Sequence, residues 1–350
     1  MESCFKMKTC IYHCLYLFML MNISILFAIL VVIRLGILLI TKGPRKMFKS
    51  TQRESPPTCL MDPKLGTHGY LYIEDVRIHY VSKGDSDKPL MLLMHGFPES
   101  WYSWRHQLKE FSDNYRVVAV DLRGYGDSDK PSGISQYKMD KLVKDVKQII
   151  TALGYSSCVL VGHDWGGAIA WIFSGLYPEM VEKVIVLNCP HPHAFKKYLQ
   201  TNWAQLKKSW YMFFFLIPIL PDIYVRLFDM KFFDIIFRGT KGGVLTNATT
   251  QEDVDAYKYL FSKRGSLTGP MNYIRAALLC RPESTTRGKV KTPVLLLWGC
   301  RDLAIEKGQA EKCKDYAEDL TIKYLHDASH WVQMDEPDTV NLYIREFIQK

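Results

Sequence analysis

The chain has 350 residues, of which 48% are hydrophobic and 23% are charged, and these ordinary globular values exclude a largely disordered protein. The formal net charge is +9, but residues 1–60 hold eight Lys or Arg against two Glu, so most of the excess lies near the N-terminus and the rest lacks the spread of positive charge that binds nucleic acid. The nine cysteines include no CxxC pair and no Cys/His cluster, so we expect neither a bound metal nor a cofactor.

The N-terminal segment, residues 1–45, is predicted to be a membrane anchor with a basic flank. Residues 11–40 are almost unbroken apolar, and 15-LYLFMLMNISILFAILVVI-33 contains only Asn22 and Ser24 as polar residues. A helix needs about 20 such residues to cross the hydrocarbon of a bilayer. The run is about twice as long as the core of a signal peptide and has no small-x-small site before its basic flank, which favours an uncleaved anchor.

Basic residues close to the span predict its orientation. They are Lys6 and Lys8 before the span, and Lys42, Arg45, Lys46 and Lys49 after it. Because the more basic side faces the cytosol, we expect a single-pass protein of the endoplasmic reticulum membrane whose larger domain is cytosolic. A glycosylation sequon at Asn247 provides a test, since glycosylation there would contradict this orientation.

Residues 46–67 are polar, basic and proline-containing and are predicted to be a linker. Beyond it, short apolar runs alternate with helix-length segments such as 137–154. The expected strands are a hairpin over 69–84 and single runs at 90–96, 116–124, 158–164, 183–189, 293–299 and 321–325. Such alternation predicts an α/β fold with a mostly parallel, eight-stranded sheet and crossover helices.

About 100 residues separate the strand that ends at 189 from the next one. They are rich in aromatic residues and show helical periodicity, as at 202–220 and 251–279. A loop of that length is improbable in a compact domain. We therefore predict a helical lid over 191–290, inserted between two parts of one α/β core at 68–190 and 291–350.

Several polar residues directly follow predicted strands. They are His95, Asp121, Asp164, Asp302 and His330. In an open parallel sheet the ligand binds beyond the carboxyl ends of the strands, so the chemistry is expected among these residues.

Asp164 lies in the G-x-D-x-G-G pattern of 160-LVGHDWGG-167, which is typical of the sharp strand-to-helix turn that exposes a nucleophile. Asp302 follows 138 residues later, and His330 follows 28 residues after that. Nucleophile, acid and histidine is the chain order of hydrolases built this way. The backbone N–H groups of Phe97, in 95-HGFPES-100, and of Trp165 are predicted to form the oxyanion hole.

Other polar residues are predicted to have structural roles. His95 is expected to bond to loop backbone, His163 to point away from the nucleophile, and Asp121 to stabilise its glycine-rich loop. His191 and His193 are expected to be turn residues at the start of the lid, because two histidines alone make no metal site.

A carboxylate nucleophile predicts displacement at a saturated carbon. Serine attacking such a carbon would leave an ether that cannot be hydrolysed, whereas Asp164 would leave an ester that His330, oriented by Asp302, can hydrolyse through a water molecule. Epoxides and alkyl halides are the two plausible substrate classes. An epoxide oxygen needs a proton donor, and the predicted lid offers Tyr198, Tyr211, Tyr224, Tyr257, Tyr259 and Tyr273.

The sequence resembles the membrane-anchored epoxide hydrolases of the α/β-hydrolase superfamily over roughly residues 68–348. The resemblance rests on HGFPESWYSWRHQ, DLRGYGDSDKP, GHDWGGAIAW, LTGPMNYIRA, LLLWGCRD and ASHWVQMDEP. It implies Asp164 as nucleophile, the Asp302–His330 pair, and two lid tyrosines that protonate the epoxide oxygen. The first corresponds to Tyr211 in KSWYMFF.

The second tyrosine of the family is replaced in this chain. The family pattern GP-x-N-(Trp/Tyr)-Tyr-Arg corresponds to 269-GPMNYIR-275, which places Ile274 at the tyrosine position and Tyr273 directly before it. Tyr273 is a tentative second donor. The alternatives are a haloalkane dehalogenase, with Trp165 as a halide donor, and a catalytically impaired membrane-bound binding module. For an active enzyme, the aromatic lid favours lipophilic epoxides.

Overall fold

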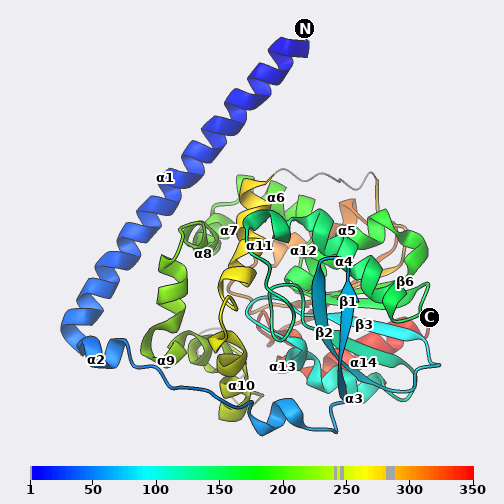
Figure 1. The fold of residues 1–350 in the computed structure, drawn as a ribbon. Helices are drawn as coiled ribbons and strands as arrows, with labels where there is room; N and C mark the ends of the chain where they lie inside the picture. Colours follow the sequence, from blue (N-terminus) through cyan, green and yellow to red (C-terminus); the bar gives the residue numbers. More distant parts are fainter. Residues whose placement is uncertain (1, 240–242, 245–247, 281–287) are drawn as a thin grey trace.

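The computed structural model describes residues 2–239, 243–244, 248–280 and 288–350, with the backbone alone for residues 2–13. Helix α1, Glu2–Lys42, and the short α2, Pro44–Met47, precede a globular domain (Figure 1). Within α1, the stretch Cys14–Lys42 is long and apolar enough to cross a membrane. Asn247, the predicted glycosylation position, lies outside the described residues.

One eight-stranded sheet forms the centre of the domain, in the order β1-β2-β4-β3-β5-β6-β7-β8. Its strands are β1 Thr67–Ile73, β2 Val76–Lys83, β3 Leu90–Met94, β4 Arg116–Val120, β5 Cys158–His163, β6 Val181–Leu187, β7 Val294–Gly299 and β8 Leu320–Leu325. The two pairs made by β2 are antiparallel and the others are parallel, which confirms the predicted sheet. Every residue of β3, β5 and β7 is buried, as expected where helices cover both faces.

Helices pack on both faces of this sheet. They are α3 Arg105–Phe111, α4 Met139–Ala152, α5 Trp165–Leu176, α12 Gly308–Lys312, α13 Val332–Asp335 and α14 Pro337–Ile348, with 3-10 turns η1 Thr58–Met61, η2 Trp101–Trp104, η3 Ile134–Tyr137, η4 Pro178–Met180 and η5 Cys313–Asp315. Helices α3 and α14 contact each other, as do α4 and α5. The predicted helix at 137–154 is confirmed as α4, whose buried Leu142, Val146 and Ile149 recur at three- and four-residue spacing.

The lid lies between β6 and β7 in the chain. Its helices are α6 Pro192–Thr201, α7 Trp203–Lys208, α8 Trp210–Phe215, α9 Leu220–Arg238, α10 Gln251–Ser262 and α11 Thr268–Leu279. The periodic stretch 251–279 is two helices, because Gly265 adopts a left-handed φ of 78° between them. Figure 1 shows α8 and α9 between α1 and the rest of the domain.

The predicted linker at 46–67 is fixed on the lid along part of its length. The carboxylate of Asp229 in α9 accepts hydrogen bonds from the backbone N–H of Thr51 and from the Arg53 guanidinium. Further along, the Glu252 carboxylate accepts a hydrogen bond from the Thr58 hydroxyl. These contacts could not be predicted from sequence, because each joins residues about 180 positions apart or more.

Candidate active site

Asp164 occupies a strained turn between β5 and α5. Its φ is 48°, a left-handed value that is uncommon for a residue with a side chain. The flanking glycines are required by close contacts, since a Cβ on Gly162 would lie 2.3 Å from the Gly166 carbonyl oxygen and one on Gly166 would lie 2.1 Å from that of Met94. The strand-to-helix turn therefore exposes Asp164 as the sequence predicted.

The residues predicted at three different strand ends meet at one point. His330 Nδ1 lies 2.7 Å from Asp302 Oδ2, and His330 Nε2 lies 3.6 Å from Asp164 Oδ2. Because the Asp302 carboxylate can only accept, Nδ1 carries a proton and Nε2 is directed at the nucleophile. This is the arrangement of a nucleophile, a base and an orienting acid.

Asp302 is held by four hydrogen bonds, so it can orient His330 without moving. Its Oδ1 accepts from the backbone N–H groups of Ala304 and Ile305, at 2.7 and 2.9 Å. Its Oδ2 accepts from the Asn188 amide at 2.8 Å as well as from His330. Asn188 was not identified from the sequence. It directly follows β6 and resembles an ordinary turn residue in sequence, and only its hydrogen bond to Asp302 shows its role.

The three ionisable groups shift one another's pKa values. Burial acts to raise the pKa of Asp164 and of Asp302, but the hydrogen bonds and charge of His330 outweigh it and both values fall below normal. Burial acts to lower the pKa of His330, but the two carboxylates raise it well above its usual value. These shifts therefore favour the charged forms of all three groups in the free site.

The backbone N–H of Phe97 donates to Asp164 Oδ1 at 2.8 Å. The loop approaches this closely because position 96 is glycine, where a Cβ would lie 2.4 Å from Asp164 Oδ1. The second predicted donor, the N–H of Trp165, begins α5 and has no hydrogen-bond partner among the described residues. Asp164 Oδ1 thus lies where an oxyanion would be bound, and Oδ2 faces His330.

The two lid tyrosines have different environments. Tyr211 in α8 is half-buried, and its hydroxyl has no hydrogen-bond partner among the described residues. Burial and then the negative charges of Asp164 and Asp302 raise its pKa, so the hydroxyl stays protonated within the field of the site. The Tyr273 hydroxyl instead donates to the Arg123 carbonyl oxygen at 2.7 Å. The Tyr273 hydroxyl is thereby engaged in a buried hydrogen bond to the backbone, whereas, in the described part of the chain, the Tyr211 hydroxyl is not.

Known proteins are similar to this chain over most of its length. The family described as alpha/beta hydrolase fold matches residues 89–337. Epoxide hydrolase 4 of Homo sapiens is 48% identical over 314 residues, covering 88% of this chain and 86% of that protein. Epoxide hydrolase 3 of Xenopus tropicalis is 42% identical over 317 residues, covering 89% and 86%. The chain belongs to the epoxide hydrolases of the α/β-hydrolase fold.

The solved structures similar to this epoxide hydrolase agree with that assignment. The epoxide hydrolase of Bacillus megaterium in complex with an inhibitor superposes with a TM-score of 0.73 at 37% identity, covering 81% of this chain and all of that one.

The residues expected to have structural roles in this epoxide hydrolase do so. His95 bonds the Gly96 carbonyl through Nδ1 and accepts from the Leu122 N–H through Nε2. Asp121 accepts from backbone N–H groups of Trp101 and Asp127, which fixes its loop. At the start of the lid, the His191 side chain accepts from the backbone N–H of His193 and caps α6.

A second buried His–carboxylate pair supports the active site of this epoxide hydrolase, and sequence reasoning missed it. His163 points away from the nucleophile as predicted, with Nδ1 2.6 Å from Glu99 Oε2 and Nε2 2.9 Å from the His330 carbonyl oxygen. Glu99 also accepts from the Gly96 N–H and the Gln333 amide. The only sequence signal was a carboxylate in the loop after a fully buried strand.

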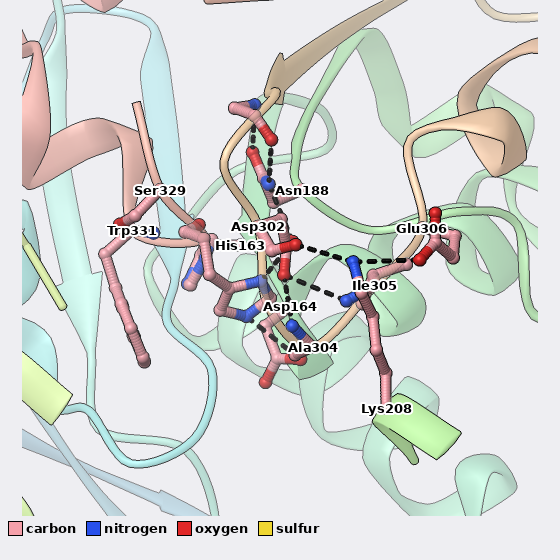
Figure 2. Close-up of polar contacts among 12 residues, drawn as sticks. His163, Asp164, Asn188, Lys208, Asp302, Ala304, Ile305, Glu306, Ser329 and Trp331 are labelled. Carbon is pink, nitrogen blue, oxygen red and sulfur yellow. Dashed lines mark hydrogen bonds and ion pairs between the residues drawn. The ribbon is translucent and has the colours of Figure 1, made fainter. Parts of the chain in front are cut away.

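The lid of this epoxide hydrolase is fixed to the loop that carries Asp302. Lys208, at the end of α7, donates to the Asp302 backbone carbonyl at 2.9 Å and pairs with Glu306 (Figure 2). Gln205 in the same helix is buried and donates to the Ala304 carbonyl. Helix α8, which carries Tyr211, follows directly, so the position of this hydroxyl depends on the same contacts.

Proposed function

We propose that this epoxide hydrolase converts epoxides to vicinal diols through a covalent ester on Asp164 Oδ2. The observation that carries the proposal is that the two carboxylate oxygens of Asp164 have different contacts. Oδ1 is held by the Phe97 N–H, whereas Oδ2 faces His330 at 3.6 Å and is free to attack. Its lowered pKa supports an ionised nucleophile at neutral pH.

In the first step a bond forms between Oδ2 and an epoxide carbon while the ring C–O bond breaks. The departing alkoxide takes a proton from the Tyr211 hydroxyl. The tyrosinate is then reprotonated at the expense of the His330 imidazolium. This transfer is favourable because esterification removes the charge of Asp164, one of the two carboxylates that keep His330 protonated.

In the second step neutral His330 takes a proton from a water molecule, and the hydroxide adds to the ester carbonyl carbon. The negative charge develops on Oδ1, where the N–H groups of Phe97 and Trp165 can stabilise it. Collapse breaks the ester C–O bond, and the second diol oxygen takes the proton of the newly formed carboxylic acid. Asp164 and protonated His330 are thereby regenerated.

A trapped intermediate tests this sequence. In a His330→Gln variant the second step should be slowed, so incubation with an epoxide should increase the intact mass by the mass of that epoxide, on the peptide containing Asp164. Single turnover of the unaltered protein in H₂¹⁸O should place the label in Asp164 and not in the first diol formed. Labelled diol, or release of halide from an alkyl halide with no diol from any epoxide, would contradict the proposal.

We further propose that α1 anchors the protein in the endoplasmic reticulum membrane with its catalytic domain in the cytosol, and that its substrates are lipophilic. The support is the apolar stretch Cys14–Lys42 with the basic residues that follow it. Resistance to alkaline carbonate extraction and absence of an endoglycosidase-sensitive mass shift are the expected results. Deletion of residues 1–42 should release the domain from membranes.

A further inference from the structure

The lid carries large apolar side chains that project from the molecule. Trp203 and Ile219 are 68% and 70% exposed, and Ile223 and Trp210 are 42% and 38% exposed. We call these four residues the lid face. Two of them, Trp210 and Ile219, belong to the segment 210-WYMFFFLIPIL-220, which has no charged residue in eleven. An apolar surface of this kind usually marks a protein or membrane contact.

The lid face continues onto the proposed anchor. Helix α1 packs along α8 through a stripe of buried Leu20, Ser24 and Val31 and partly buried Phe27, which recur at three- and four-residue spacing. The Phe27 ring lies 6.2 Å from that of Trp210, a residue of the lid face. Most of the remaining apolar surface of α1 is exposed, so whatever covers α1 also reaches the lid.

The linker that follows the anchor is fixed to the lid as well. Residues 228–230 of α9 adopt left-handed φ values of 53°, 56° and 59°, which are unfavourable for residues with side chains. Asp229, at the centre of this kink, pairs with Arg53, and its backbone N–H donates to the Lys49 carbonyl. Phe48 and Ile223 line one cavity beside this contact. The lid is therefore held by the anchor at Trp210 and by the linker beside Ile223.

Helix geometry then gives the depth of the lid in a membrane. The apolar run begins at position 11, and a rise of 1.5 Å per residue places Leu20 about 14 Å and Phe27 about 24 Å along the helix from there. The hydrocarbon layer is about 30 Å thick. An anchor that crosses it at right angles brings Phe27 and Trp210 to within about 6 Å of the domain-side boundary of this layer, and Leu20 lies deeper. Any tilt places them deeper.

We propose that the lid face inserts into the domain-side leaflet of the membrane that α1 crosses, and that the active site takes epoxides dissolved in that leaflet. This inference rests on the proposed anchor and deepens the proposed function. Trp210 of the lid face is followed in α8 by Tyr211, whose ring lies 5.8 Å from that of Phe215. The Phe215 ring in turn lies 5.6 Å from that of Phe97, whose backbone N–H binds Asp164. One short helix therefore contributes both to the lid face and to the surroundings of Asp164.

Tryptophan fluorescence tests the insertion. Of the eight tryptophans, Trp101, Trp104, Trp165, Trp171, Trp298 and Trp331 lie in the globular core and are buried or partly buried, and only Trp203 and Trp210 belong to the lid face. The full chain is reconstituted in phosphatidylcholine vesicles with or without bromine on the acyl chains. We expect the brominated chains to quench part of the emission, and a Trp203→Phe/Trp210→Phe variant to lose that quenched part.

A comparison of a membrane-dissolved epoxide with a water-soluble one tests whether the active site takes its substrate from the leaflet. A Trp203→Ser/Ile219→Ser/Ile223→Ser variant keeps Trp210, Tyr211 and the α1 stripe. Its hydrolysis of a long-chain fatty epoxide carried in the vesicles should fall by about tenfold or more, since the burial of even one large apolar side chain is worth that factor. Its hydrolysis of a short, water-soluble epoxide in the same vesicles should be unchanged, which controls for loss of folding.

The outcomes separate this inference from those on which it rests. Equal quenching of wild type and the Trp203→Phe/Trp210→Phe variant, or an equal fall for both substrates, would overturn lid insertion. A protein that fails to float with the vesicles would overturn both the anchor and the insertion. Loss of quenching in the variant, together with no turnover of any epoxide by the wild type, would support insertion and refute the proposed reaction.

Discussion

At the scale of single residues, the proposed reaction depends on His330 lying between two carboxylates. Both raise its pKa, so replacing Asp164 with Asn, which resembles the neutral ester, should lower the pKa of His330 towards its ordinary value. Titration of the His330 ring carbon signals by NMR measures this change. A Tyr211→Phe variant is the matched control, because it keeps both carboxylates and should leave His330 protonated over the same pH range.

The same pair of shifts sets how stability depends on pH. A raised pKa for His330 contributes stability that is fully present below about pH 6.5 and is lost as pH rises through the folded-state value. The lowered pKa values of Asp164 and Asp302 act in the opposite sense, and their contribution is lost as pH falls through the folded-state values. Both contributions are present between the lowered pKa of Asp164 and the raised pKa of His330. The loss of stability caused by Asp164→Asn, relative to wild type, should therefore be largest in that pH range. An unchanged pH profile of thermal unfolding would contradict this coupling.

At the scale of helices, α8 and α11 give two tyrosines different tasks. Tyr211→Phe should slow formation of the ester by roughly 10²–10⁴-fold, the usual contribution of a general acid, and leave ester hydrolysis nearly unchanged. Rapid-quench mass spectrometry of the Asp164 ester separates the two rates. Tyr273→Phe should instead destabilise the fold by about 1–2 kcal/mol, because the Arg123 carbonyl loses its donor, with little effect on ester formation. If Tyr273→Phe slowed ester formation and Tyr211→Phe only lowered stability, Tyr273 and not Tyr211 would be the proton donor.

At the scale of the whole molecule, the Glu99–His163 pair joins the loops after β3, β5 and β8. It lies beneath the oxyanion loop, the nucleophile and His330, and both side chains are fully buried. Glu99→Gln should destabilise the protein by about 3–5 kcal/mol, because it leaves part of a buried pair without its partner. The unfolding midpoints of Glu99→Gln, His163→Gln and the double variant measure this coupling. Additive losses would show that the pair does not act as a unit.

Sequence by itself determined the sheet and the three central residues of the site. Asp164, Asp302 and His330 each follow an apolar strand, and the carboxyl ends of parallel strands meet at one edge, so local patterns were sufficient to bring them together. The need for glycine on either side of Asp164 could also be predicted from the sequence motif, because the turn leaves no space for a side chain there.

Tertiary structure decided the rest of the site. Neighbouring residues of a helix point about 100° apart, so only the docking of α11 could decide that the Tyr273 hydroxyl meets Arg123. Asn188, Glu99 and Gln333 are ordinary polar residues until folding brings their partners to them. The packing of α1 on α8 could not be predicted from the sequence either. An apolar helix can be covered by lipid or by protein, and its composition is the same in both cases.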